Sequence, residues 1–223
     1  MRTIVLSLSG SVVYDDSAFN ASYIKELYRL LSRRKEKFVV VVGGGPVARQ
    51  LIKSASAIVK SKFTLDEIGI AASRINALVV SEIMHGSTLA DSIYELKNLS
   101  NYSKIIVIGG IVPGITTDSV AELACEALGS KLLINISKTS YLYDLNPSYT
   151  GAHKIVTASF EQLLGRAFSD DKREPGTNFM FDVFASILAR RSGIEIKFVD
   201  ARINELEKVL NGKKHDGTTV KGR

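Results

Sequence analysis

Three short glycine-containing segments carry the strongest chemical signal in this sequence. The segment 9–11 reads SGS, the segment 43–45 reads GGG, and the segment 109–118 reads GGIVPGITTD. Each follows an apolar run of the kind that forms a buried strand. Bare backbone N–H groups in such loops, together with the N-termini of following helices, bind phosphate oxygens well. The pattern therefore predicts a site for phosphorylated ligands.

The common phosphate-binding motifs do not account for these loops. No GxxxxGK[ST] sequence is present, and the segment 43–48, GGGPVA, lacks the GxGxxG spacing of dinucleotide-binding folds. Arg49 lies about one turn into the helix predicted after the triple glycine, and its planar donors suit phosphate oxygens. A purely structural alternative stays open, in which Gly114 serves a turn and Thr117 caps a helix.

The elements that position these loops follow from the hydrophobic pattern. Strands are expected at 4–8, 38–42, 104–108, 131–136, 154–157 and 194–199. Helices are expected after a cap at Asn20, at 47–59, 64–84 and 89–99, from 117 or 118 to 129, from a capping box at 159–162, at 178–191 and at 203–210. This β–α alternation predicts an α/β protein with a mainly parallel sheet and helices on both faces. The glycine loops are then expected to converge beyond the carboxyl ends of the strands.

Bulk properties narrow the class of protein. The chain has 223 residues, one cysteine and a net charge of +6 from 29 basic and 23 acidic residues. The basic residues are scattered and not interleaved with aromatic ones, so we expect anionic small substrates and no nucleic-acid partner. A single cysteine excludes a disulfide framework, and Cys125 is expected to be buried. No apolar run reaches the length of a membrane span, so the protein is expected to be cytoplasmic, with no membrane partner.

Four stretches together resemble a known family. They are GGGPVAR at 43–49, LDEIGIAASRINA at 65–77, IGGIVPGITTDSVAELACEALGS at 108–130 and HDGTTV at 215–220. They are similar to the amino acid kinase superfamily and, within it, to the archaeal type of uridylate kinase. The resemblance spans almost the whole chain. It implies a three-layer α/β/α sandwich in a single domain, 1–223, with UMP bound in the N-terminal half, to about residue 130, and ATP in the C-terminal half.

The same resemblance implies an activity and a set of site residues. The family transfers the γ-phosphoryl group of MgATP to UMP, with Mg²⁺ carried by ATP and no metal ligands from the protein, and its members in this branch are homohexamers built as trimers of dimers. By resemblance, the residues at ATP would be Gly10, Ser11, Gly45, Arg49, Ser137, Tyr143 and Asn146. Those at UMP would be Gly44, Asp66, Val112, Pro113, Gly114, Ile115, Thr116, Thr117 and Asp118. Arg49 would support the transferred phosphoryl group.

The chain departs from the family pattern in two places. Many relatives carry lysine in a K-x-x-G arrangement where this chain has Ser7, so we expect Lys138 to supply the missing catalytic cation. Relatives read roughly T-x-V-D-G-V-Y-x-x-D-P where 137–147 reads SKTSYLYDLNP. The Val-Asp-Gly is replaced by Thr-Ser-Tyr at 139–141, and Asp144 offers a carboxylate in a different register.

These departures keep two alternatives open. One is a phosphotransferase of the same superfamily with acetylglutamate, carbamate or isopentenyl phosphate as acceptor. The other is a nucleotide-binding regulatory protein without catalysis.

Overall fold

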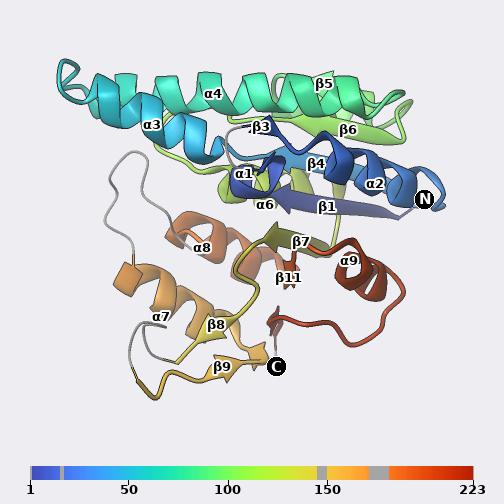
Figure 1. Ribbon diagram of the computed structural model, residues 1–223. Coiled ribbons are helices and arrows are strands. Elements are labelled where there is room, and N and C mark those ends of the chain that lie inside the picture. The colour runs from blue at the N-terminus through green and yellow to red at the C-terminus, as the bar shows by residue number, and fades with distance from the viewer. Residues whose placement is uncertain (1, 16–17, 145–149, 171–180, 223) are drawn as a thin grey trace.

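The computed structural model describes residues 2–15, 18–144, 150–170 and 181–222. Within them, strands and helices alternate along most of the chain (Figure 1). The strands are β1 (Thr3–Leu8), β2 (Tyr14–Asp15), β3 (Ala18–Phe19), β4 (Lys37–Val42), β5 (Thr88–Ala90), β6 (Ile105–Ile108), β7 (Leu132–Ser137), β8 (Leu142–Tyr143), β9 (Lys154–Ile155), β10 (Thr157–Ala158), β11 (Glu195–Asp200) and β12 (Thr219–Val220). The helices are α1 (Gly10–Val13), α2 (Ala21–Ser32), α3 (Gly45–Ala55), α4 (Lys62–Ile83), α5 (Ile93–Leu99), α6 (Thr117–Leu128), α7 (Phe160–Asp170), α8 (Val183–Ser192) and α9 (Ile203–Leu210).

The central sheet has eight strands in the order β10-β12-β11-β7-β1-β4-β6-β5. All neighbours from β11 to β5 pair in parallel, whereas β12 runs antiparallel to β11. The carboxyl ends of the six parallel strands therefore lie along one edge of the sheet. This arrangement confirms the predicted mainly parallel sheet and places the loops after β1, β4, β6 and β7 side by side.

Both faces of the sheet are covered, because the strand residues alternate between two apolar clusters. In β4, Phe38, Val40 and Val42 belong to one cluster, and Val39 and Val41 belong to the other. The first cluster includes side chains of α2, α4 and α9, and the second includes side chains of α5, α6, α7 and α8. The predicted three-layer α/β/α sandwich is thus confirmed. Cys125 on α6 is fully buried in the second cluster, as predicted.

The segment predicted as a helix at 89–99 differs from expectation. It divides into the edge strand β5, which pairs in parallel with β6, and the helix α5. The side chain of Ser92 caps α5 by accepting a hydrogen bond from the Glu95 N–H. The apolar residues of a three-residue strand fit a helical period equally well, so only the pairing with β6 separates the two elements.

Two other element ends differ in detail. The long helix α4 begins at Lys62 with Ser61 as its cap, and not with the capping box predicted at 64–67. The strand predicted at 154–157 is two short strands, because β9 pairs with β8 while β10 pairs with β12.

Several predicted caps are confirmed. Asn20 caps α2, and Ser159 and Gln162 form a reciprocal capping box at the start of α7. Gly193 ends α8 in the left-handed conformation, as expected for a C-terminal glycine. Within the described ranges, we find no helix with both the length and the apolar character that crossing a membrane requires.

Candidate active site

A cavity of about 530 Å³ opens at the carboxyl edge of the sheet, beyond β7, β1, β4 and β6. All three glycine segments contribute to its walls, which confirms that they converge. Thirteen of the predicted site residues line it: Gly10, Ser11, Gly44, Gly45, Arg49, Asp66, Gly114, Ile115, Thr116, Thr117, Asp118, Ser137 and Lys138. These thirteen residues therefore lie around one cavity, while the roles assigned to them stay predictions.

Three other predicted residues, Val112, Pro113 and Tyr143, are not part of the cavity lining, and a fourth cannot be placed. Val112 and Pro113 lie on the turn before Gly114, where Val112 is largely exposed. Tyr143 is part of β8, where its backbone pairs with Lys154 of β9. Asn146 lies outside the described residues.

The carboxylate considered at Asp144 does not reach the cavity either. Its Oδ1 accepts a hydrogen bond of 2.7 Å from the backbone N–H of His153, and its Oδ2 lies 3.1 Å from His153 Nδ1. Asp144 therefore links the end of β8 to the residue before β9, and the residues that line the cavity do not include it.

The triple glycine is required first of all by contact between two loops. A side chain on Gly10 would overlap the backbone of Gly45, and a Cβ on Gly45 would lie only 2.6 Å from the carbonyl oxygen of Gly10. Gly45 also has a φ of +65°, a conformation that other residues rarely adopt. Because the loops after β1 and β4 are in backbone contact, the start of α3 is held directly beside the start of α1.

The third glycine loop is fastened to the middle of α4. Ser73 accepts a hydrogen bond of 2.8 Å from the N–H of Gly110, and Arg74 donates one of 2.9 Å to the Gly110 carbonyl oxygen. Asp66, earlier on the same helix, accepts one of 2.9 Å from the N–H of Gly114. Gly114 has a φ of +86°, so the structural interpretation of this glycine as a turn residue is correct.

The same helix also holds the second glycine loop. Asn76 is buried on α4, and its Nδ2 donates to the carbonyl oxygens of Gly43 and Gly44 at 2.9 and 3.1 Å. The hydroxyl of Tyr14 donates to the remaining oxygen of Asn76 at 2.7 Å. The motif at 65–77 therefore acts as a brace between two loops, a role that sequence reasoning did not give to its serine, arginine and asparagine.

The start of α6 forms the wall opposite these loops. Thr116, and not Thr117, is the cap, because its side chain accepts from the N–H groups of Asp118 and Ser119. Asp118 lies in the first turn, where a carboxylate complements the helix dipole. Its Oδ1 accepts hydrogen bonds of 2.7 Å from Ser7 Oγ and 2.8 Å from Asn135 Nδ2. Burial is the main cause that raises the pKa of Asp118 to about 7.

Ser7, at the lysine position of the first family motif, makes a hydrogen bond within the cavity wall. Where the family resemblance leads us to expect lysine, this chain has a neutral hydroxyl that donates to Asp118. Among the described residues lining the cavity, positive side chains come from Arg49 on α3 and Lys138 after β7. That Lys138 takes over the role of the missing lysine stays a prediction.

Asp182 is a cavity residue that the sequence analysis missed. It is 1% exposed, lies at the start of α8, and accepts a hydrogen bond of 2.9 Å from the Ala185 N–H. The same carboxylate accepts from the hydroxyls of Thr116 and Ser119. An aspartate before an apolar helical run is an N-cap signal, but the predicted start of this helix at 178 concealed it.

A second buried carboxyl lies one turn beyond Asp118 on the same helix. Glu122 is fully buried, and within the described residues neither of its carboxyl oxygens has a hydrogen-bond partner. Burial, with Asp118 as the next contribution, raises the pKa of Glu122 well above its ordinary value. This environment favours the neutral, protonated form of the carboxyl over the carboxylate.

A family model described as the amino acid kinase family matches residues 2–200. The chain belongs to the amino acid kinase family. Its similarity to individual members also extends over the full length. A protein named uridylate kinase from Thermoplasma acidophilum is 33% identical over 223 residues, covering 98% of this chain and 96% of the relative. A uridylate kinase from Ignicoccus hospitalis is 38% identical over 206 residues, covering 89% of this chain and 90% of the relative.

A solved structure of this amino acid kinase family supports the fold directly. The crystal structure of uridylate kinase from Archaeoglobus fulgidus matches with a TM-score of 0.85 and 31% sequence identity. The match covers 99% of this chain and 100% of that one. The resemblance inferred from the four motifs is therefore confirmed at the level of both sequence and fold.

Proposed function

We propose that this protein is a UMP kinase, which transfers the γ-phosphoryl group of MgATP to UMP and yields UDP and ADP in pyrimidine nucleotide biosynthesis. The observation that carries the proposal is the single cavity in which three glycine loops, Arg49 and Lys138 meet, in a chain similar along its length to proteins named uridylate kinase. Phosphoryl transfer needs alignment of donor and acceptor and positive charge around the migrating group.

The two nucleotides are proposed to approach from the two halves of the sheet. UMP would lie over the loops after β4 and β6, against Gly44, Asp66 and the start of α6. ATP would lie over the loops after β1 and β7, against Gly10, Ser11 and Ser137. Because β7, β1, β4 and β6 are consecutive in the sheet, the phosphates of both nucleotides would meet near its middle.

The chain's own groups would then act by position and charge. Gly44 at the cap position and Gly45 at the start of α3 both line the cavity, and their lack of side chains leaves room for phosphate oxygens near the helix N-terminus. Arg49 would neutralise equatorial oxygens of the transferred group, and Lys138 would do so from the opposite loop. These interactions grow as negative charge shifts during the transfer, so they would lower its barrier.

Mg²⁺ would enter with ATP, and the donor groups of the cavity fit that arrangement. Oδ1 of Asp118 and both carboxylate oxygens of Asp182 accept hydrogen bonds from donors of the protein itself. No cluster of three or more His, Cys, Asp or Glu residues suited to a metal is found in the described parts of the chain. Mg²⁺ bound by the β- and γ-phosphates would supply charge neutralisation.

Self-association is part of the proposal. The helices α3 and α4 and the segment between them expose large apolar side chains: Leu51, Ile58, Phe63, Ile75 and Leu78. The helices α3 and α4 themselves lie side by side in one outer layer (Figure 1). A surface of this kind supports a dimer, and three dimers would form the homohexamer expected from the resemblance. We also propose a cytoplasmic location.

A coupled ADP-release assay with MgATP and a panel of acceptors tests the function. The panel contains UMP, CMP, dUMP, AMP, GMP, acetylglutamate, carbamate and isopentenyl phosphate. We expect release with UMP well above that with the other acceptors. Faster ADP release with another acceptor would mean that this acceptor, and not UMP, is the substrate. No release from folded protein that still binds UMP would favour a regulatory role.

A further inference from the structure

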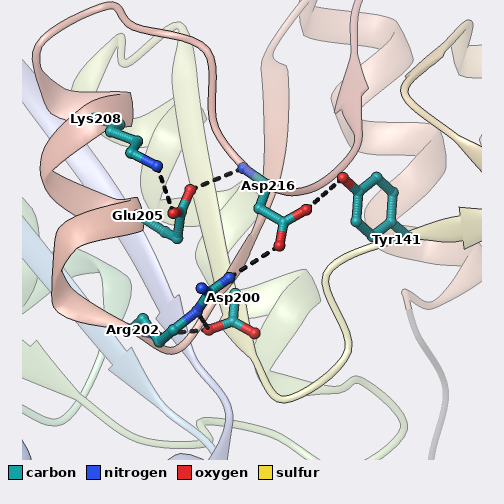
Figure 2. A network of polar contacts seen from close by, with 6 residues as sticks. All are labelled: Tyr141, Asp200, Arg202, Glu205, Lys208 and Asp216. Carbon is teal, nitrogen blue, oxygen red and sulfur yellow. Dashed lines mark hydrogen bonds and ion pairs between the residues drawn. The ribbon is translucent and has the colours of Figure 1, made fainter.

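The replacement of Val-Asp-Gly by Thr-Ser-Tyr at 139–141 is the largest departure of this chain from its family, and the function above leaves it unexplained. In the structure, the hydroxyl of Tyr141 donates a hydrogen bond of 2.6 Å to Asp216 Oδ1. The other oxygen of Asp216 accepts one of 2.9 Å from Arg202 Nη2. Figure 2 shows these side chains directed toward one another from three separate segments of the chain.

This network continues on both sides. Arg202 Nε donates to Asp200 Oδ1 at 2.7 Å, at the carboxyl end of β11. The backbone N–H of Asp216 donates to Glu205 at 2.8 Å, and Lys208 pairs with the same carboxylate (Figure 2). The tail segment before β12 is therefore attached to both the cap residue and the first turn of α9.

Tyr141 is held at its ring as well as at its hydroxyl. The ammonium group of Lys154, on β9, lies 4.4 Å from the centre of the ring. A cation at this distance over an aromatic face is attracted to it. The hydrogen bond to Asp216 is also the main cause that raises the pKa of Tyr141, so the phenol keeps its proton as a donor.

The backbone beside this network joins the same segments. The N–H of Thr218 donates to the carbonyl oxygen of Ser140 at 2.9 Å, and the N–H of Leu142 donates to Thr218 Oγ1 at 2.9 Å. On its other side, the carbonyl oxygen of Thr218 accepts from the N–H of Phe198 in β11. Residues 140–142 are thus bound to the tail, and the tail is bound to the sheet.

The consequence concerns the two residues just before this anchor. Ser137 is fixed by pairing in the sheet, where it lies opposite Asp200, and Ser140 is fixed by Thr218. Only Lys138 and Thr139 lie between these fixed points, and both line the cavity. The turn is tightened further because the Thr139 N–H donates to Ser137 Oγ at 3.1 Å.

We propose that Tyr141, Asp216 and Arg202 form a clamp that positions the Lys138–Thr139 turn on the ATP side of the cavity. They are positioning residues, which act through Lys138 and do not touch the reacting groups. This inference rests on the proposed function for the identity of the nucleotide. In this chain the clamp takes the place of the Val-Asp-Gly segment of relatives.

The test compares Tyr141→Phe with the wild type, because this change removes one hydroxyl and keeps the ring over which Lys154 lies. We expect turnover to fall and the KM for ATP to rise, each by about threefold to tenfold, with the KM for UMP unchanged within twofold. Asp216→Asn, which keeps the shape of the side chain, should change the same two parameters. Tyr102→Phe, at a highly exposed tyrosine outside the cavity, serves as the matched control and should match the wild type.

A calorimetric titration separates this proposal from the proposed function. The probe is the non-hydrolysable analogue adenosine 5′-(β,γ-imido)triphosphate with Mg²⁺, and UMP is titrated separately. Weaker binding of the analogue alone by Tyr141→Phe would support the clamp even if the wild type formed no UDP. Unchanged ATP parameters and analogue binding, or equal losses for both nucleotides, would overturn it. A wild type that binds neither nucleotide would overturn both proposals.

Discussion

The carboxylate of Asp182 accepts a hydrogen bond from the hydroxyl of Thr116. Asp182 begins α8, and Thr116 begins α6, so one carboxylate ties together the starts of two helices that are distant in the sequence. The hydroxyl of Thr116 in turn accepts from the backbone of Asp118 at 3.2 Å. The wall of the cavity formed by α6 is therefore held in place by a group from the proposed ATP half of the chain.

Asp182→Asn tests this coupling, because it keeps the size of the side chain and removes its charge. An amide replaces one acceptor oxygen by a donor, so the hydroxyls of Thr116 and Ser119 and the N–H of Ala185 cannot all be satisfied. We expect the free energy of unfolding to fall by about 1–3 kcal/mol, as for a buried group left unpaired. We also expect the KM for UMP to rise more than the KM for ATP.

Denaturant unfolding and steady-state kinetics measure the two effects. Asp91→Asn, at an exposed aspartate in the turn before α5, is the control and should change neither quantity by a measurable amount. An Asp182→Asn protein with the stability and both KM values of the wild type would show that the link between the two helices is not needed.

Arg49→Ala tests the proposed role of the cavity's guanidinium group. Arg49 is exposed on α3, so its loss should change the free energy of unfolding by no more than about 0.5 kcal/mol. Turnover should fall by about 100-fold or more, as for loss of a group that stabilises developing charge. Lys53→Ala, one turn further along α3 and outside the cavity lining, is the control. An unchanged turnover number would remove Arg49 from the mechanism.

Gly45→Ala tests the contact between the first two glycine loops. The new Cβ would lie 2.6 Å from the Gly10 carbonyl oxygen in a backbone conformation with positive φ. We expect the free energy of unfolding to fall by more than about 1 kcal/mol, because strain and overlap add. The control is Gly165→Ala on α7, where a Cβ meets no atom within 4 Å.

The control variant should change the free energy of unfolding in the opposite direction. Alanine is favoured over glycine within a helix, so Gly165→Ala should raise the free energy of unfolding by about 0.5–1 kcal/mol. Thermal unfolding of the two variants and of the wild type measures both changes in the free energy of unfolding. If Gly45→Ala were as stable as Gly165→Ala, the two loops would not be in the contact described.

Two carboxyl groups of α6, those of Asp118 and Glu122, are expected to make the stability of the protein depend on pH. Burial raises the pKa of Asp118 to about 7 and that of Glu122 well above its ordinary value, so the folded state holds protons that the unfolded state loses. The free energy of unfolding contributed by these groups is therefore fully present below about pH 4, near their unfolded pKa values. It falls as the pH rises from each unfolded pKa toward the higher folded one, which for Asp118 is about 7.

Glu122→Gln removes one of these two titratable carboxyls and changes no residue of the cavity lining. Because the amide of glutamine does not titrate, the variant should gain free energy of unfolding relative to the wild type as the pH rises from 5 to 8. Denaturant titrations of both proteins at the two pH values measure this gain. A constant difference between the proteins would mean that Glu122 is not protonated in the folded state.

Local patterns allowed most of the fold to be predicted from the sequence. Apolar runs marked β1, β4, β6 and β7, and the glycine segments after them marked the cavity edge. The pattern failed at β5, where a three-residue strand is defined by its pairing with β6 and not by its own sequence. It also misplaced the start of α4, because Ser61 and Thr64 are both acceptable cap residues.

The site was predicted less completely for a related reason. Residues in glycine loops and in recognisable motifs were found, whereas Asn135 and Asp182 act through contacts with Asp118 and Thr116 that no local pattern reveals. The contact of Tyr141 with Asp216 joins residues 75 positions apart. The sequence showed that the loop at 137–147 departs from its family, but not what the new side chains contact.

The most direct test of the central claim is the formation of UDP itself. Purified protein is incubated with MgATP and UMP, and all nucleotides are separated and quantified by chromatography over time. We predict that UDP and ADP appear in equal amounts and that neither appears when UMP is omitted. ADP without UDP, or no product from folded protein, would contradict the assignment of this cavity to phosphoryl transfer between ATP and UMP.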